Sequence, residues 1–254
     1  QPASGYLDPT ELLAAWLDHP NITLRHSEVI ALNRSGDQWE LLDRRGHRFS
    51  DPVVVVASGA NCTELAPFAD LPLESVSGQV SSLAMNAETG KLKTIVCGER
   101  TLFPADHNTH LVAASYGGNG GAEIDEENRR LAGNIFQQPG ILDQAVTGSA
   151  TAWRCRSSDY LPIVGPVPDW PGMRQLLAPL QRNAKAVIDA PGKYLPGLYL
   201  STAHGSNGMA SCPLAGEYLA SLICNENLPV DGDTVAALHP LRFLLRKLKR
   251  QEPA

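Results

Sequence analysis

Residues 197–224 read GLYLSTAHGSNGMASCPLAGEYLASLIC. This pattern predicts a short strand at 197–201, a tight loop at 203–208 and an amphipathic helix over 209–224, with Pro213 in the first turn of that helix. The apolar face of the helix consists of Leu214, Tyr218, Leu219 and Leu222. A strand that reaches a helix through a glycine-rich loop places free backbone N–H groups and the positive end of the helix dipole together. Such a place suits an anion, or a ring that becomes anionic.

A run of four valines, Val53–Val56, is followed by Ala57 and then by Ser58, Gly59 and Ala60. An uninterrupted apolar run of this length predicts a strand buried on both faces, as in a parallel sheet. The small residues after it would let a flat cofactor or another backbone segment approach closely, although simple helix–strand packing would also select them.

The remaining pattern alternates helical and β-rich blocks. Near the start, Asp8 and Pro9 fit the cap and first turn of a helix over 7–16, and the runs 23–32 and 38–42 suit a hairpin. Three further β-like runs and a helix follow, at 78–83, 94–97, 111–115 and 126–136. We therefore expect an α/β fold with a central antiparallel α+β part.

Composition restricts the classes of protein that need to be considered. The 254 residues are 43% hydrophobic and 19% charged with a net charge of −6, which is ordinary for a globular chain and excludes fibrous and disordered classes. No apolar run approaches the roughly 18 residues that a membrane span needs, so we expect no membrane association. The chain begins with Gln1, and no signal segment follows. We therefore expect it to be part of a longer, cytoplasmic protein.

Cysteine and histidine spacing gives no sign of a metal site. The five cysteines are dispersed without a CxxC pair, as in reduced cytosolic proteins. His107 and His110 stand in a segment expected to be a loop and lack supporting carboxylates, so we predict no metal ligand.

Arg154 is the candidate for binding a carboxylate. It stands near the end of an expected strand and is followed by the turn Asp159–Pro162, so its planar guanidinium could be aimed at an anion. On spacing alone, surface arginines around a turn are the simpler interpretation.

The chain ends in a basic segment, HPLRFLLRKLKR at 239–250. One face of a helix here would carry Arg242, Arg246, Lys249 and Arg250, and the other Leu241, Leu244, Leu245 and Leu248. Such a helix in an acidic protein fits contact with phosphates. It fits equally well a solvated terminal helix whose cations complement its own dipole.

Together these segments resemble the D-amino-acid-oxidase-like flavoproteins, and among them most closely the C-terminal oxidoreductase half of bifunctional tRNA-modifying enzymes. The matching residues are Gly5-Tyr6-Leu7, Val53–Ala60, Val76–Val80, Ala114–Tyr116, Arg154-Cys155, Asp159-x-Leu161-Pro162-x-Val164-Gly165, Gly205-Ser206-x-Gly208 and Ala237–Phe243. The resemblance covers nearly the whole chain. It implies a glutathione-reductase-like FAD-binding domain, formed by 1–70 and 186–254, and an antiparallel substrate domain at 71–185.

The resemblance also implies a reaction and roles for individual residues. The reaction is FAD-dependent oxidation of carboxymethylaminomethyl-uridine at the wobble position of tRNA, with a methyltransferase half fused or associated. Arg154 would hold the substrate carboxylate. FAD would lie against Ser58, Gly59, Ala60, Gly205, Ser206, Asn207, Gly208 and Met209. tRNA would meet Arg242, Arg246, Lys247, Lys249 and Arg250.

Two departures from the family pattern stand beside this resemblance. The family opens with a βαβ unit whose GxGxxG loop binds the FAD pyrophosphate, and these 254 residues contain no such motif. Asn207 also stands where the family's oxidase loop usually has arginine. The alternatives are therefore an oxidase of a small amino acid or amine with the same fold, and a non-catalytic fragment that folds without holding FAD.

Overall fold

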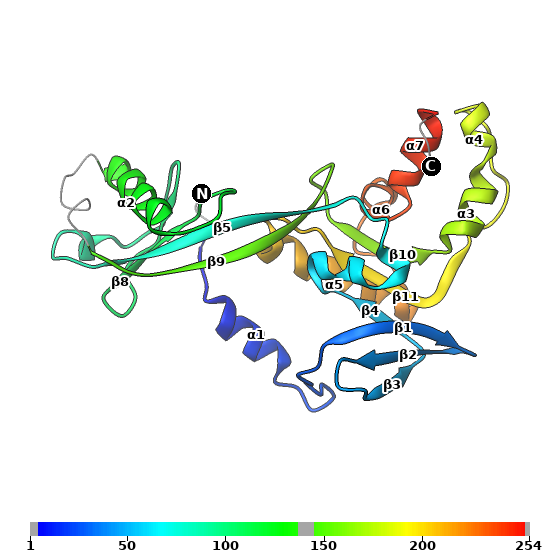
Figure 1. Ribbon diagram of the computed structural model, residues 1–254, viewed down its shortest axis with the longest axis horizontal. Coiled ribbons are helices and arrows are strands. Elements are labelled where there is room, and N and C mark those ends of the chain that lie inside the picture. The colour runs from blue at the N-terminus through cyan, green and yellow to red at the C-terminus, as the bar shows by residue number, and fades with distance from the viewer. Residues whose placement is uncertain (1–4, 137–144, 252–254) are drawn as a thin grey trace. The chain divides into compact units, whose positions relative to one another are not determined.

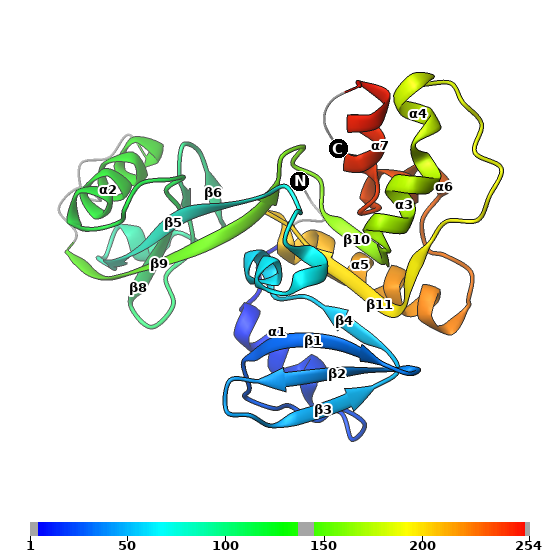
Figure 2. The same cartoon turned by 45° about the vertical axis from the view of Figure 1, so that its right-hand side comes forward.

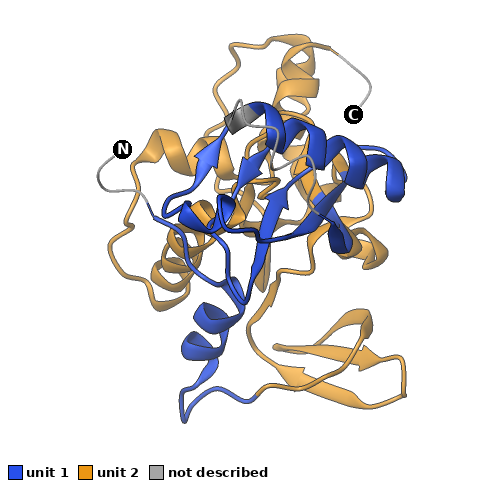
Figure 3. Cartoon of the chain, turned by 90° about the vertical axis from the view of Figure 1, so that its left-hand side faces the viewer, with its two compact units in different colours: residues 1–23, 75–154 blue, residues 24–74, 155–254 orange. Residues whose placement is uncertain are grey.

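The computed structural model describes residues 5–136 and 145–251. The chain divides into two compact units (Figures 1 and 3). Unit 1 consists of Gln1–Thr23 and Ser75–Arg154, and unit 2 of Leu24–Glu74 and Cys155–Ala254. Our boundaries at 70/71 and 185/186 concern the cofactor and substrate roles of the domains and stay a prediction.

Unit 1 is built on an antiparallel sheet with the strand order β6-β7-β8-β5-β9. Figure 1 labels three of its strands, β5, β8 and β9. Its elements are α1 (Pro9–Leu17), β5 (Leu73–Ala84), η3 (Thr89–Lys91), β6 (Val96–Cys97), β7 (Thr101–Leu102), β8 (Thr109–Ala113), α2 (Ala122–Phe136) and β9 (Val146–Ser157). In β8, His110 and Val112 are buried while Leu111 between them is exposed, as the two-residue period of a strand requires. His110 is therefore in a buried strand and not in the loop that we expected.

Helix α1 begins as its sequence predicts. The Asp8 carboxylate accepts hydrogen bonds from the amides of Thr10, at 2.6 Å, and Glu11, at 3.3 Å, and Pro9 occupies the first turn. The helix buries none of its own residues.

Unit 2 contains two three-stranded sheets, β1-β2-β3 and β10-β11-β4 (Figure 2). Its strands are β1 (Val29–Ser35), β2 (Gln38–Asp43), β3 (Arg48–Asp51), β4 (Val54–Val56), β10 (Ile163–Pro168) and β11 (Tyr194–Thr202). Its helices are η1 (Gly59–Glu64), η2 (Ala66–Phe68), α3 (Trp170–Leu177), α4 (Pro179–Arg182), α5 (Gly208–Cys224), α6 (Gly232–Leu238) and α7 (Arg242–Lys249). The predicted hairpin is confirmed as β1 and β2, although β1 starts at Val29.

The valine strand is confirmed as part of a parallel pair, because β4 runs parallel to β11 with Val56 opposite Leu200. The expectation that it is buried on both faces is wrong. Val56 is 7% exposed, but Val55 is 42% exposed. Alternation along the three residues places Val54 and Val56 on one face and Val55 on the other, and only the face of Val54 and Val56 meets the core.

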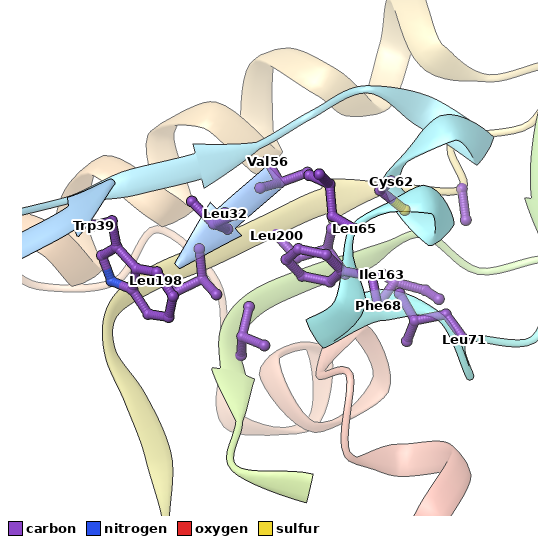
Figure 4. Packing of buried hydrophobic residues seen from close by; sticks show 12 residues of the cluster. Leu32, Trp39, Val56, Cys62, Leu65, Phe68, Leu71, Ile163, Leu198 and Leu200 are labelled. Atoms are coloured by element: carbon purple, nitrogen blue, oxygen red, sulfur yellow. The ribbon is translucent and has the colours of Figure 1, made fainter. Parts of the chain in front are cut away.

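The main core of unit 2 lies where β4, β10 and β11 meet the two short helices η1 and η2 (Figure 4). Cys62, Phe68, Ile163 and Leu198 are fully buried there. Each large apolar side chain buried in this way contributes roughly 1.5–3 kcal/mol. This cluster fixes the strand ends from which the loops of the candidate site leave.

Helix α5 follows β11 as predicted, with two differences. It begins at Gly208, so Pro213 lies inside the helix beyond the first turn. Tyr218 and Leu219 pack against Val164, but Leu214 is 49% exposed and does not belong to the packed face. The narrower apolar stripe leaves the N-terminal turns of α5 outside the core.

No helix within residues 5–136 and 145–251 has the length and apolar character that crossing a membrane requires. In the same residues, no group of three or more His, Cys, Asp or Glu side chains could hold a metal ion.

Candidate functional site

Arg154 lies near the end of β9 in unit 1, where its guanidinium is fixed by main-chain groups. Its Nη1 donates to the carbonyl oxygens of Ser77, at 3.3 Å, and Ser115, at 3.2 Å. The guanidinium carbon also lies 5.7 Å from the ring centre of Tyr116, within the range of a cation–π contact. No carboxylate pairs with Arg154 in the part of the chain that the structure describes. Its positive charge is therefore held in position without being neutralised.

Gly78 of β5 makes room for Arg154. A Cβ atom at Gly78 would overlap the guanidinium group, so any larger residue would displace it. The adjacent Gln79 is 2% exposed and accepts a hydrogen bond from the Gly121 amide at 2.6 Å through its side chain, which ties down the glycine-rich loop after Tyr116. Sequence reasoning missed the roles of Gly78 and Tyr116. Both residues stand in segments that carry the family resemblance, and that resemblance is the sequence signal that could have pointed to them.

The two segments predicted to face FAD converge in unit 2 through the residues between them. The Thr202 hydroxyl donates to the Gly59 carbonyl at 2.9 Å, and the Gly205 amide donates to the Cys155 carbonyl at 2.8 Å. Cys155 and Thr202 are themselves in contact, at 3.7 Å between Sγ and Oγ1. Ser58–Ala60 and the loop at Gly205 therefore border one small region.

Backbone conformation in this region requires small residues. Gly59 has φ of +61° and Gly205 has φ of +57°, in the left-handed region that glycine enters without steric cost. Ala203, which is 2% exposed, also has a positive φ of +62°. A non-glycine residue held in this way stores backbone strain, and such strain concentrates at functional loops.

The first turn of α5 presents unsatisfied amides beside this loop. In the described residues, the amides of Ser206, Gly208 and Met209 donate no hydrogen bond, and the Asn207 side chain does not cap the helix. Met209 is 50% exposed, so the turn is accessible. Three free N–H groups at the positive end of a 17-residue helix are a suitable setting for an anionic group.

His204 holds the same turn from inside. Its Nε2 lies 3.1 Å from the Ser201 hydroxyl and its Nδ1 lies 2.8 Å from the Ser211 hydroxyl. Because the Ser211 hydroxyl donates its single hydrogen to the Asn207 carbonyl at 2.8 Å, Nδ1 must be the donor towards Ser211. Burial lowers the pKa of His204, so the ring stays neutral and keeps this arrangement at neutral pH.

These residues fit FAD in the part that they would touch. A flat ring needs close backbone approach, which the two left-handed glycines permit, and its reduced form carries negative charge, which the free amides of α5 would stabilise. The residues Ser58, Gly59, Ala60, Gly205, Ser206, Asn207, Gly208 and Met209 stay the predicted cofactor contacts. Arg154 belongs to unit 1, whereas these eight residues belong to unit 2.

Helix α7 differs from our expectation at Arg242. This residue is 5% exposed and binds the Asp159 carboxylate through Nε and Nη2, both at 2.9 Å. It also donates to the carbonyls of Leu238 and Leu161 at 2.9 Å. The expectation that Arg242 lies on an exposed basic face for tRNA is therefore wrong, because all its donors are used inside the protein.

The other cations of α7 are exposed. Arg246, Lys247, Lys249 and Arg250 face solvent, while Leu244 and Leu248 pack against α3 and α4. Arg246 additionally pairs with Asp159. Burial raises the pKa of the Asp159 carboxyl, but hydrogen bonds from Arg242, Ser157 and Arg246 outweigh that effect and hold the pKa well below its usual range.

Comparison with known proteins identifies the family of this chain. Residues 1–222 match the family described as FAD dependent oxidoreductase, DAO. The chain belongs to the DAO family of FAD-dependent oxidoreductases.

Particular relatives narrow this class. The chain is 36% identical, over 98% of its length, to the tRNA 5-methylaminomethyl-2-thiouridine biosynthesis bifunctional protein MnmC of Stutzerimonas stutzeri. It is likewise 36% identical, over 99% of its length, to the protein of the same name from Aeromonas hydrophila. In both cases the chain spans 40% of the relative's length.

Solved structures show the same fold. Glycine oxidase from Geobacillus kaustophilus matches with a TM-score of 0.64 at 21% identity, over 85% of this chain and 52% of its own. Iminodiacetate oxidase from Chelativorans sp. BNC1 matches with a TM-score of 0.65 at 20% identity, over 86% and 54%. The predicted fold class, a flavoprotein fold with an antiparallel-sheet part, is confirmed.

Proposed function

We propose that this protein oxidises the carboxymethylaminomethyl group of (2-thio)uridine at the wobble position of tRNA. The carbon between the amine and the carboxylate is oxidised, water then cleaves the C=N bond so formed, and glyoxylate leaves aminomethyl-(2-thio)uridine behind. One observation carries the proposal: the guanidinium of Arg154 is fixed by the carbonyls of Ser77 and Ser115 and has no carboxylate partner among the described residues.

Arg154 would bind the substrate carboxylate and so orient the carbon to be oxidised. Because both hydrogen bonds of the guanidinium leave from Nη1, Nε and Nη2 donate to no other group in the part of the chain that the structure describes. The edge that Nε and Nη2 form has the geometry for a two-point pair with a carboxylate. A lysine has no such fork and would not replace it.

Bound FAD would supply the oxidation by accepting two electrons and a hydrogen from the substrate carbon. The chain's own contribution there is electrostatic. The free amides at the start of α5 would stabilise negative charge, and neutral His204 would hold the turn that presents them.

The names of the relatives and the exposed cations of α7 support tRNA as the substrate. Both bifunctional relatives are named for tRNA 5-methylaminomethyl-2-thiouridine biosynthesis. The exposed cations Arg246, Lys247, Lys249 and Arg250 stay predicted contacts for tRNA phosphates. We further propose a cytoplasmic location and a fused or associated methyltransferase domain as the second activity.

The experiment supplies tRNA that carries carboxymethylaminomethyl-2-thiouridine to the complete, FAD-loaded protein. We expect glyoxylate and aminomethyl-2-thiouridine in equal amounts, by chemical assay and by mass spectrometry of the nucleosides. Oxidation of free glycine or another small amine with the tRNA left unchanged would establish the alternative oxidase. A complete protein that never binds flavin would establish the non-catalytic alternative.

A further inference from the structure

A cavity of about 630 Å³ lies in unit 2, and none of the residues predicted to touch FAD lines it. Its walls come from the segment Asp70–Pro72, from α3 and from α7. Ligand-binding cavities measure about 300–1,000 Å³, so this one has the size for a small organic ligand and is larger than a lone phosphate needs.

Four cations line the cavity from two helices. Arg174 comes from α3, Arg246 and Lys247 come from α7, and Arg250 is the residue that caps the C-terminal end of α7. Arg246, Lys247 and Arg250 follow Phe243 by three, four and seven positions, which puts all four on one face of the helix. The protein as a whole carries a net charge of −6, so this concentration of positive charge is local.

The two carboxylates of the cavity do not cancel this charge. Asp159 is already bound by two arginines, the buried Arg242 and Arg246. Asp70 lies 3.7 Å from Arg174, but it is 89% exposed, and an ion pair so exposed contributes little. Lys247 has no carboxylate partner in the described residues.

An apolar wall accompanies the cations. Trp170 and Phe243 line the cavity, and both rings are held in place. The Trp170 Nε1 donates to the Pro67 carbonyl at 2.8 Å, and the Arg242 guanidinium lies 4.2 Å from the centre of the Phe243 ring. Fixed aromatic groups beside cations suit a ligand that has a flat ring and a phosphate.

We propose that this cavity binds one nucleotide of an RNA chain, with its phosphate at Lys247, Arg250 and Arg174 and its base against Trp170 and Phe243. That the RNA is the tRNA substrate rests on the proposed function above. The cavity thereby divides the exposed cations of α7: Arg246, Lys247 and Arg250 line it and Lys249 does not. It also adds Arg174 of α3, which sequence reasoning missed because α3 showed no basic run.

The test compares single alanine substitutions that each remove one positive charge. Lys247→Ala, Arg250→Ala and Arg174→Ala alter the cavity, whereas Arg182→Ala on the neighbouring α4 lies outside it and serves as the control. Binding of labelled tRNA to the complete protein is measured at two salt concentrations. Thermal melting of each variant verifies that it is folded.

We expect each cavity variant to weaken tRNA binding about 3- to 10-fold and to lower the slope of log K against log salt by about 0.7–0.9. We expect Arg182→Ala to stay within about twofold, because it changes only the general field. A loss in Arg182→Ala as large as in the cavity variants, or no loss in the cavity variants, would overturn the proposal.

Two competitors separate the sources of the ligand. Uridine monophosphate and inorganic phosphate are each added to the wild-type complex with labelled tRNA. The proposal expects competition only at concentrations far above that of competing unlabelled RNA, because one cavity supplies a fraction of the contacts. If uridine monophosphate binds as tightly as RNA and loses affinity in Lys247→Ala, the cavity serves a free nucleotide and the assignment to RNA is wrong.

The readout also separates this inference from the proposed function. A protein that binds tRNA through the cavity but forms no glyoxylate contradicts the proposed reaction and supports the cavity. A protein that forms glyoxylate, and whose tRNA affinity the cavity variants do not change, contradicts the cavity alone.

Discussion

Arg154 and Arg242 lie in two regions that look alike in sequence, since each is an arginine beside an aromatic residue and close to a turn. Arg154 is held by two carbonyl oxygens and a ring, so its charge stays available. Arg242 is held by a carboxylate and two carbonyls, so its charge is used within the fold. The partner of an arginine, more than its burial, decides whether it can bind a ligand.

The largest effect that we expect is a loss of stability when Arg242 is replaced. Arg242→Ala would leave the Asp159 carboxylate, which is 18% exposed, without its main partner. Because a buried ion pair that loses one member leaves an uncompensated charge, the free energy of unfolding should fall by about 3 kcal/mol. Urea denaturation measures this, with Lys249→Ala as a control expected within about 0.5 kcal/mol.

Weaker tRNA binding in Arg242→Ala at unchanged stability would reverse our assignment. Arg242 would then be a ligand contact, and the contrast with Arg154 would disappear.

The same region should make stability depend on pH. Burial, with the charge of Arg242 as a second cause, lowers the pKa of His239 from 6.5 to about 4. Between these values the unfolded chain binds a proton that the folded chain does not, so stability falls as the pH drops from about 6.5 to 4, by roughly 2–3 kcal/mol in total. The depressed pKa of Asp159 adds a further loss below about pH 3.9.

Thermal melting from pH 7 to pH 4 measures this dependence. In His239→Asn the decline between pH 6.5 and 4 should be much smaller, because no imidazole remains to be protonated. An identical decline in wild type and variant would show that another group causes it.

A smaller effect is expected from Gly78→Ala, which changes the surroundings of Arg154. The backbone at Gly78 tolerates alanine, but the new methyl group would push the Arg154 guanidinium out of its position. We expect kcat/KM for the tRNA substrate to fall at least about tenfold, since small misplacements of a positioning group are costly. Flavin content and melting temperature serve as controls, and unchanged turnover would show that Arg154 needs no fixed position.

The smallest effect is expected from Tyr116→Leu. The centre of the Tyr116 ring lies 5.7 Å from the Arg154 guanidinium carbon. An exposed cation–π contact of this kind contributes about 0.5–1 kcal/mol. Substrate KM should rise by about two- to fivefold. A loss as large as that of an Arg154 variant would mean that Tyr116 itself binds the substrate.

Sequence alone predicted most of the local structure. The Asp8–Pro9 helix start, the hairpin, the valine strand of a parallel pair and the strand–loop–helix around Gly205 depend on short-range patterns, and all four are present. The error at Arg242 came from a long-range contact. Asp159 stands 83 residues before Arg242, so no helical-face argument could show that this arginine is buried.

The candidate site could also be predicted from the sequence only in part. Arg154 and the glycine loops were found from motifs, but the space that Gly78 leaves for Arg154 exists only once β5 and β9 are in one sheet. Likewise, Arg174 meets the cations of α7 only through packing of α3 and α7 around Met173 and Leu244. Features of this kind depend on tertiary packing and carry no local signal.

The central claim is that Arg154 recognises the carboxylate of the substrate, and one measurement tests it directly. Wild type and Arg154→Ala are each given tRNA with the carboxymethylaminomethyl group and tRNA with the methylaminomethyl group, which lacks the carboxylate. A charge-assisted two-point pair contributes roughly 2–5 kcal/mol, so kcat/KM for the first substrate should fall about 30-fold or more in the variant. For the second substrate it should change by less than about threefold. If the variant loses both activities equally, or neither, Arg154 does not bind the carboxylate and the account is contradicted.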